Sequence, residues 1–475
     1  MTAFHYFLVA LEVVLVFNLL IGVHELGHFL AAKWRGLKID RFAIWFGKPV
    51  WKARIGGIEY ALGWIPAGGY VALPQMASME AIEGKSGAKA EALPPVSALD
   101  KIIVAFAGPL FSFGLAVCFA FIVWGVGKPG DASNRSTEIG WVFPGGPAWK
   151  AGLRPGDVIR KVNGHPVSYF EPPPLDSVKW RIITSEGTNI PIQYTSVRDG
   201  RLHTAYPIAY HAPTKPWERK ALRQILVAPA AKAIVGDVAS NSPAALAGLT
   251  NGDRIIALDG EKIYSPLAVG AAEESMSNGP VRPIALTVVR DHREFVRSIT
   301  PERPVEPAGN PPSMGIRDWM GDTNMLLSHP TPQEQIWTSL HQITATLRAI
   351  TAPKSDIGVQ QLGGAVMIAR VYYYLLQSDY AWRQVLWFSV VLNVNLALIN
   401  MLPLPVLDGG HILLSLIEAV RRRPMSAKLL NTIQTGFAML IIGFMLYIAF
   451  FDTGDWLRSA SANREQPLVF APPRS

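Results

Sequence analysis

The chain has few charged residues and almost no cysteine. Only 17% of its 475 residues are charged and 49% are hydrophobic, whereas ordinary soluble domains carry about 25% charge. This balance excludes an intrinsically disordered chain, which needs low hydrophobicity and high charge. The single cysteine, Cys118, excludes an intramolecular disulfide framework and any zinc site built on two or more cysteines. The composition therefore predicts a membrane protein.

Four long stretches carry most of the hydrophobic residues. Each is long and apolar enough to cross a bilayer core, which takes about 20 residues of helix. They cover residues 4–32, 102–126, 385–407 and 429–451. A signal peptide is the alternative for the first stretch, but no basic residue precedes it, it has no small-residue cleavage site, and it is too long. We therefore expect four transmembrane helices.

The basic residues beside these stretches predict their orientation. Segment 31–101 holds ten Lys or Arg against six Asp or Glu, and segment 408–428 holds four against two. The positive-inside rule places both segments in the cytoplasm. Both termini and segment 127–384 are then expected outside, and the net charge of +8 gives no reason to expect a nucleic-acid partner. The first and third stretches run in the same direction, so their C-terminal ends lie at the same depth.

The end of the first stretch contains the motif H-E-x-x-H. His24 and His28 are four residues apart and share one helix face, so both imidazoles can reach one zinc ion. Glu25 is adjacent and is suited to act as the general base on a water molecule. Ionisable residues inside an apolar span are expensive and usually mark function. The motif predicts a catalytic zinc site with one ion.

A catalytic zinc ion needs a third protein ligand. Asp408 and His411 follow the third stretch within the run L-D-G-G-H, at the depth expected for His24. Carboxylate and imidazole groups both bind zinc. The residues alone favour Asp408 only slightly, and His411 stays open.

With H-E-x-x-H in the first span and L-D-G after a later one, the chain resembles the site-2 protease family. Members of this family are membrane-embedded zinc metalloproteases. The resemblance implies that Asp408 is the third ligand and that Asn395 and Asn400 contact the substrate. The alternative for these two asparagines is hydrogen bonding between helices.

Two further segments resemble the same family. Residues 40–75 are similar to its membrane-re-entrant β-loop beside the active site. Gly108-Pro109 in the second span matches a family motif, in which Ser112 stands where asparagine is usual.

The outer segment contains an internal repeat. Residues 139–164 and 235–260 align at a constant offset of 96 and share 11 identical positions. Each copy is typical of a short strand, a small helix ended by glycine, and a hairpin. The copies resemble bacterial PDZ domains, which bind extended peptides or chain ends, although compact spacers without a ligand are an alternative. We expect two tandem α/β PDZ-like domains at 130–215 and 225–305, then a linker and an amphipathic helix within 306–384.

The expected architecture is a polytopic α-helical membrane protein with a re-entrant β-loop and these two modules. Its membrane core comprises residues 1–126 and 385–475. Two PDZ-like modules resemble the regulator-of-sigma-E branch of the family. That resemblance implies a bacterial inner-membrane endoprotease, with its active site near the cytoplasmic side and its modules and termini in the periplasm. It also implies single-span membrane substrates, such as an anti-sigma factor or signal-peptide remnants.

Two other functions are alternatives to the protease. A membrane-anchored PDZ scaffold with a non-catalytic metal site has no need of a general base such as Glu25. A transporter predicts inverted repeats among the spans, and none is apparent in the sequence.

Overall fold

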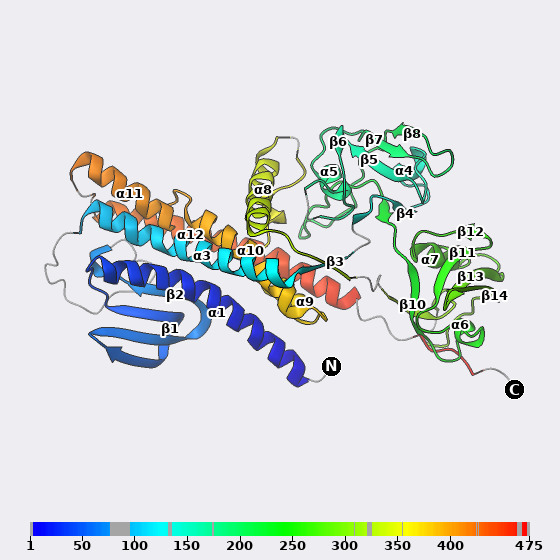
Figure 1. Cartoon of the computed structure of the whole chain (residues 1–475), viewed down its shortest axis with the longest axis horizontal. Helices are drawn as coiled ribbons and strands as arrows, with labels where there is room; N and C mark the ends of the chain where they lie inside the picture. Colours follow the sequence, from blue (N-terminus) through cyan, green and yellow to red (C-terminus); the bar gives the residue numbers. More distant parts are fainter. Residues whose placement is uncertain are drawn as a thin grey trace. The chain divides into compact units, whose positions relative to one another are not determined.

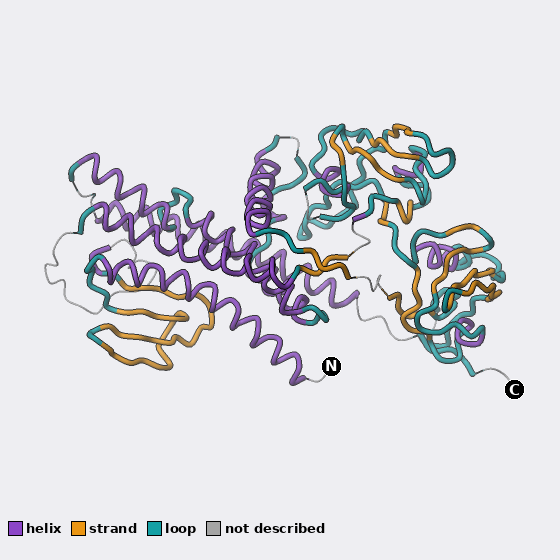
Figure 2. Tube along the Cα trace, viewed as in Figure 1, coloured by secondary structure: helices purple, strands orange, loops and turns teal. Residues whose placement is uncertain are grey.

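The computed structural model describes residues 3–76, 96–131, 135–172, 175–307, 309–320, 325–353, 355–423, 425, 427–462 and 468–472. The chain forms two compact units (Figures 1 and 2). The helical unit comprises residues 1–129, 327–345 and 362–453. The sheet unit comprises residues 130–326, 346–361 and 454–475.

Four helices in the described part of the chain are long and apolar enough to cross a membrane, as expected. They are α1 (Ala3–Trp34), α3 (Ala98–Val126), α10 (Ala381–Asn400) and α12 (Ala427–Ala462). The third one ends earlier than predicted. α10 stops at Asn400, and residues 401–407 form turns before α11 (Asp408–Arg421) begins. Pro403 and Pro405 explain the difference, because proline lacks the N–H that a continuing helix needs.

Helix α3 packs against α1, α10 and α11 in the middle of the helical unit (Figure 1). Its buried positions are mostly small: Ala105, Ala107, Gly108, Ser112, Ala116 and Ala120. Small side chains let helix backbones approach closely, which is a common means of helix association in membranes. At Gly27 on α1, a side chain would collide with the Ala107 carbonyl of α3. The two helices therefore cross in close contact.

Residues 40–75 form the predicted β-structure. Strands β1 (Arg41–Ile55) and β2 (Ile58–Ala72) make an antiparallel hairpin, followed by a short 3-10 helix, η1 (Pro74–Met76). Both strands bend, so that residues 41–44 pair with residues 59–62 on one side and with residues 69–72 on the other. Phe42 and Tyr60 of the hairpin pack against Phe29 of α1.

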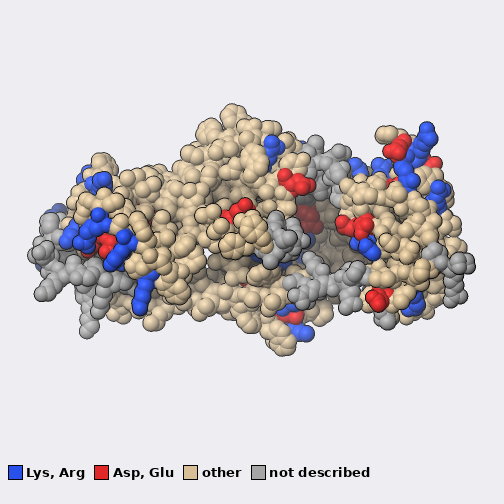
Figure 3. Space-filling model, turned by 90° about the horizontal axis from the view of Figure 1, so that it is seen from below, with Lys and Arg blue, Asp and Glu red and all other residues tan. Residues whose placement is uncertain are grey.

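Charged side chains gather at the end of the helical unit where this hairpin lies, and the middle of the unit is mostly uncharged on the face drawn in Figure 3. Ion pairs among the described residues of segments 31–101 and 408–428 include Arg35–Asp100, Lys38–Asp40, Arg41–Glu59 and Lys101–Glu418. They belong to the two segments whose basic excess predicts a cytoplasmic position.

The repeat in the sequence is a repeat in the structure. The first copy begins with β4 (Ile139–Val142), α4 (Pro147–Lys150), β5 (Val158–Val162) and β6 (His165–Pro166). The second begins with the matching β10 (Ala233–Val238), α6 (Pro243–Leu246), β11 (Arg254–Leu258) and β12 (Glu261–Lys262). The buried Asp157 and Asp253 each accept a backbone N–H at 2.8 Å, from Arg154 and Thr250 respectively.

Each repeat module extends beyond its predicted end. The first continues through α5 (Val178–Ile183), β7 (Ile192–Thr195) and β8 (Leu202–Ala205) to β9 (Val227–Pro229), which pairs with β4. The second continues through α7 (Leu267–Glu274), β13 (Ile284–Arg290) and β14 (Arg293–Ile299) to β15 (Ile316–Met320), which pairs with β10. Both of these strands lie beyond the predicted ends at 215 and 305, and each follows an irregular segment of chain.

The remaining elements connect these parts. They are β3 (Lys128–Asp131), β16 (Met325–Ser328), α8 (Pro332–Thr351), η3 (Val359–Gln361) and α9 (Ala365–Leu376). α8 is the predicted amphipathic helix. Its apolar stripe is largely exposed at Trp337 and Leu347, whereas Gln335 and Ser339 are buried.

Candidate active site

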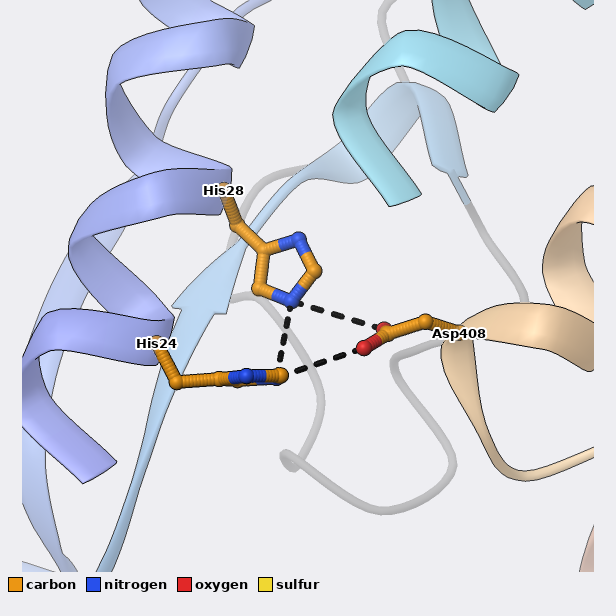
Figure 4. Close-up of side chains that lie close together, drawn as sticks. All are labelled: His24, His28 and Asp408. Atoms are coloured by element: carbon orange, nitrogen blue, oxygen red, sulfur yellow. Dashed lines mark hydrogen bonds and ion pairs between the residues drawn. The ribbon is translucent and has the colours of Figure 1, made fainter. Parts of the chain in front are cut away.

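Three side chains predicted from distant parts of the sequence meet in the helical unit. His24 and His28 come from α1, and Asp408 is the first residue of α11 (Figure 4). The Nε2 atoms of the two histidines lie 3.2 Å and 3.4 Å from the Asp408 carboxylate oxygens, and 3.3 Å from each other. All three residues are buried. We call them the triad.

Both histidine rings are held from behind by α3. His28 Nδ1 lies 2.8 Å from the carbonyl oxygen of Val104, and His24 Nδ1 lies 3.0 Å from Ser112 Oγ. Contacts of this kind orient the rings of metal-binding histidines and select their tautomer. They leave both Nε2 atoms facing Asp408. Ser112, which stands where the family motif usually has asparagine, makes this contact.

Gly108 of α3 leaves the space in front of the rings free. A Cβ atom at this position would collide with Nε2 of both His28 and His24. The next residue, Pro109, is also buried. The Gly-Pro motif thus places a residue without a side chain against the triad.

The turn after α10 brings Asp408 to the histidines. It folds back so tightly over the start of α11 that a side chain at Gly409 would meet the Met401 and Leu402 carbonyls, and one at Gly410 would meet the Leu404 carbonyl. Two consecutive glycines after Asp408 therefore permit the close approach that places its carboxylate.

A cavity opens beside the triad. Glu25 lines it, together with Phe46 of β1 and Gly68 and Gly69 of β2, so the hairpin forms one wall. α10 contributes Asn400, the region around the start of α11 contributes His411, and α12 contributes Gln434. Three groups that could hold a metal ion, the carboxyl group of Glu25 and strand backbone thus share one cavity.

The other residues predicted for the site differ in their positions relative to the cavity. Asn400 lines the cavity, with Nδ2 at 3.4 Å from His24 Nε2. Asn395 is not among the residues that line the cavity, and its Oδ1 is buried without a hydrogen-bond partner in the described structure. His411 is buried in the cavity wall but stands outside the triad. Gln434 also lines the cavity, and nothing in the sequence distinguishes it from the nearby polar residues Asn431, Thr432 and Thr435.

The triad has the chemistry of a zinc site. Its three donor atoms lie within 4.8 Å of one another, and they are two imidazole nitrogens and one carboxylate oxygen. Zinc in catalytic sites takes three such ligands and keeps one position open. His24, His28 and Asp408 would hold such an ion, and the absence of a side chain at Gly108 keeps the space next to both Nε2 atoms free.

Comparison with known proteins agrees with this chemistry. The family model of peptidase family M50 matches residues 12–443. Proteins named regulator of sigma-E protease RseP from Salmonella typhimurium and Escherichia coli are each 27% identical, over 91% of this chain and 96% of theirs. A Vibrio cholerae protein named as a zinc metalloprotease is 28% identical over 87% of this chain and 91% of its own. The chain therefore belongs to peptidase family M50 and is a zinc metalloprotease of the site-2 protease type.

Proposed function

We propose that this protease cuts single-span membrane proteins within or near their transmembrane helix. The observation that carries the proposal is the triad itself, buried between helices that are apolar enough to span a membrane and adjacent to Glu25. Ionisable groups inside a membrane-spanning segment are energetically costly, and where they occur they usually serve a function.

In this proposal His24, His28 and Asp408 hold the zinc ion and Glu25 is the general base. When bound, zinc supplies a Lewis acid that polarises a peptide carbonyl and makes water more acidic. Glu25 accepts the proton of the attacking water and passes it to the leaving amine. Ser112 and the Val104 carbonyl keep the two imidazoles oriented.

The edge of β2 is the proposed binding site for the cleaved segment. A transmembrane helix satisfies its own backbone groups, so it must unwind before its peptide bonds can be attacked. Residues 69–72 pair with β1 along one side, and Gly69 lies against the Glu25 side chain. An extended peptide can add to such an edge by main-chain hydrogen bonds. In this proposal the hairpin is a re-entrant loop that dips into the membrane beside the active site.

The repeat modules are proposed to be PDZ-like domains that select substrates. They would bind a peptide or chain terminus, or restrict the size of the outer part of a substrate. In this proposal the modules and both termini are periplasmic, in a bacterial inner membrane, and the active site is near the cytoplasmic side. Relatives named regulator of sigma-E protease make an anti-sigma factor the first substrate to examine, followed by signal-peptide remnants.

The first experiment is Glu25→Gln, assayed with a single-span reporter protein. We expect the variant to retain zinc and to lose cleavage, because an amide cannot take up the proton. Cleavage at the wild-type rate would refute the role of Glu25. Proteomic comparison of membranes from wild-type and Glu25→Gln cells would then identify accumulated substrates.

The second experiment separates the two candidate third ligands. Zinc content is measured in purified Asp408→Ala and His411→Ala. We expect loss of zinc in the first variant only. Loss only from the His411 variant would overturn the assignment of Asp408.

A further inference from the structure

Gln434 is a buried amide in the N-terminal part of α12, where the polar residues beside it, Asn431, Thr432 and Thr435, are exposed. Farther along α12 many side chains are apolar and exposed, for example Met439, Leu440 and Leu446. Gln434 is 1% exposed and lines the cavity of the triad. A buried polar residue within a span is a candidate for a functional role.

Only one end of the Gln434 amide is occupied. Its Nε2 donates to the Pro405 carbonyl at 3.4 Å, which is a long contact. Its Oε1 is buried and has no hydrogen-bond partner among the described residues. A buried carbonyl oxygen without a donor is unfavourable, so such a group in a binding cavity is a candidate to accept a hydrogen bond from a ligand. The other amide in the cavity, Asn400, has its Nδ2 3.4 Å from His24 Nε2.

An unwound substrate would bring the missing donor. An extended chain presents N–H and C=O groups along both of its edges. If β2 pairs with one edge, the groups on the other edge still need partners, because no bulk water is present at membrane depth. Among the described residues that line the cavity, Gln434 offers an unoccupied amide oxygen for such an N–H.

We propose that Gln434 is a substrate-binding residue whose Oε1 accepts one backbone N–H of the unwound segment beside the triad. This inference rests on the proposed cleavage of an unwound transmembrane segment. It adds a residue of α12 to a cavity otherwise lined by α1, the hairpin, α10, the turn after α10 and the start of α11.

The test combines a protein variant with a change of one substrate atom. Gln434→Leu removes the acceptor and keeps a side chain of similar size. The substrate is a synthetic single-span reporter polypeptide, in which each residue near the cleaved bond is replaced in turn by its α-hydroxy acid, so that an ester oxygen replaces one N–H. We expect Gln434→Leu to lower kcat/KM about tenfold, the effect of one buried hydrogen bond, mainly through KM. Its zinc content should equal that of the wild type.

At one position, the hydroxy-acid replacement should lower the kcat/KM of the wild-type protein by about the same factor. The same replacement should not lower the kcat/KM of Gln434→Leu any further. The matched control is Gln335→Leu on α8, because Gln335 is also buried with an unpartnered Oε1 but lies outside the cavity. Its kcat/KM should be unchanged. Wild-type kinetics in Gln434→Leu, loss of zinc together with activity, or equal costs at every hydroxy-acid position in both proteins would each overturn the inference.

Binding measured in the Glu25→Gln background separates this inference from the proposed function. If the wild type fails to cut the reporter, the proposed function fails. The inference itself is then decided by whether Gln434→Leu weakens reporter binding about tenfold in that background. Equal binding would refute it.

Discussion

Ser112→Ala should weaken zinc binding without touching any of the proposed ligands. The Ser112 hydroxyl is fully buried on α3 and lies 3.0 Å from His24 Nδ1. Alanine would leave that ring nitrogen buried without its partner and would free the ring to turn. His28 is protected from such a change, because its partner is the backbone carbonyl of Val104.

The magnitude follows from the loss of one contact behind a metal ligand. Removing such a partner typically costs 10–100-fold in metal affinity, which corresponds to about 1.4–2.7 kcal/mol. The upper part of that range is expected here, because both partners are buried and water cannot replace the hydroxyl.

The assay is a competitive zinc titration of the purified protein in detergent against a chelator of known affinity. Ser339→Ala is the matched control, because Ser339 is equally buried but bonds to the Gln335 carbonyl on α8. The control should bind zinc as the wild type does. Unchanged affinity in Ser112→Ala would refute the argument that this hydroxyl supports His24.

Three further predictions concern the metal space, the metal itself and the second repeat module. Gly108→Ala should abolish zinc binding, since its Cβ would meet both Nε2 atoms, whereas Gly114→Ala in the same helix meets nothing and should bind zinc normally in the same titration. Removing zinc with a chelator should lower the thermal unfolding temperature of the helical unit, because a ligand that binds only the folded state stabilises it. Burial raises the pKa of Asp253, but the hydrogen bonds from Arg290 outweigh this and hold the pKa below its ordinary value. Its contribution to the unfolding free energy is therefore complete at neutral pH and is lost as the pH falls through that lowered pKa. Asp253→Asn should cost about 1–3 kcal/mol at pH 7 and flatten this acid dependence in denaturant titrations. An unchanged midpoint would contradict the role of this ion pair.

Local patterns in the sequence were enough to predict the four spans and the repeat, whereas the β-structure of residues 40–75 was predicted from the family resemblance. Uninterrupted apolar runs identify spans, because a bilayer leaves backbone groups no other partner than their own helix. Spacing of four on a helix brings His24 and His28 to one face whatever surrounds them. The ends of elements depend on different signals. α10 ends at Asn400 because Pro403 and Pro405 follow it. The pairing of β9 with β4 and of β15 with β10 joins distant segments and has no local signal in the sequence.

The rest of the site depends on contacts between segments far apart in the chain. The residues after α10 offered both Asp408 and His411, and the folded turn brings only Asp408 against the histidines. Which side of α3 faces α1 is likewise decided by packing, and it puts Gly108 and Ser112 beside the triad. No periodicity links these positions to His24. The sequence thus specifies the chemistry that one helix carries. Tertiary packing selects Asp408 as the third member of the triad, the partners behind the rings and the amide of Gln434, because these come from helices with independent sequence patterns.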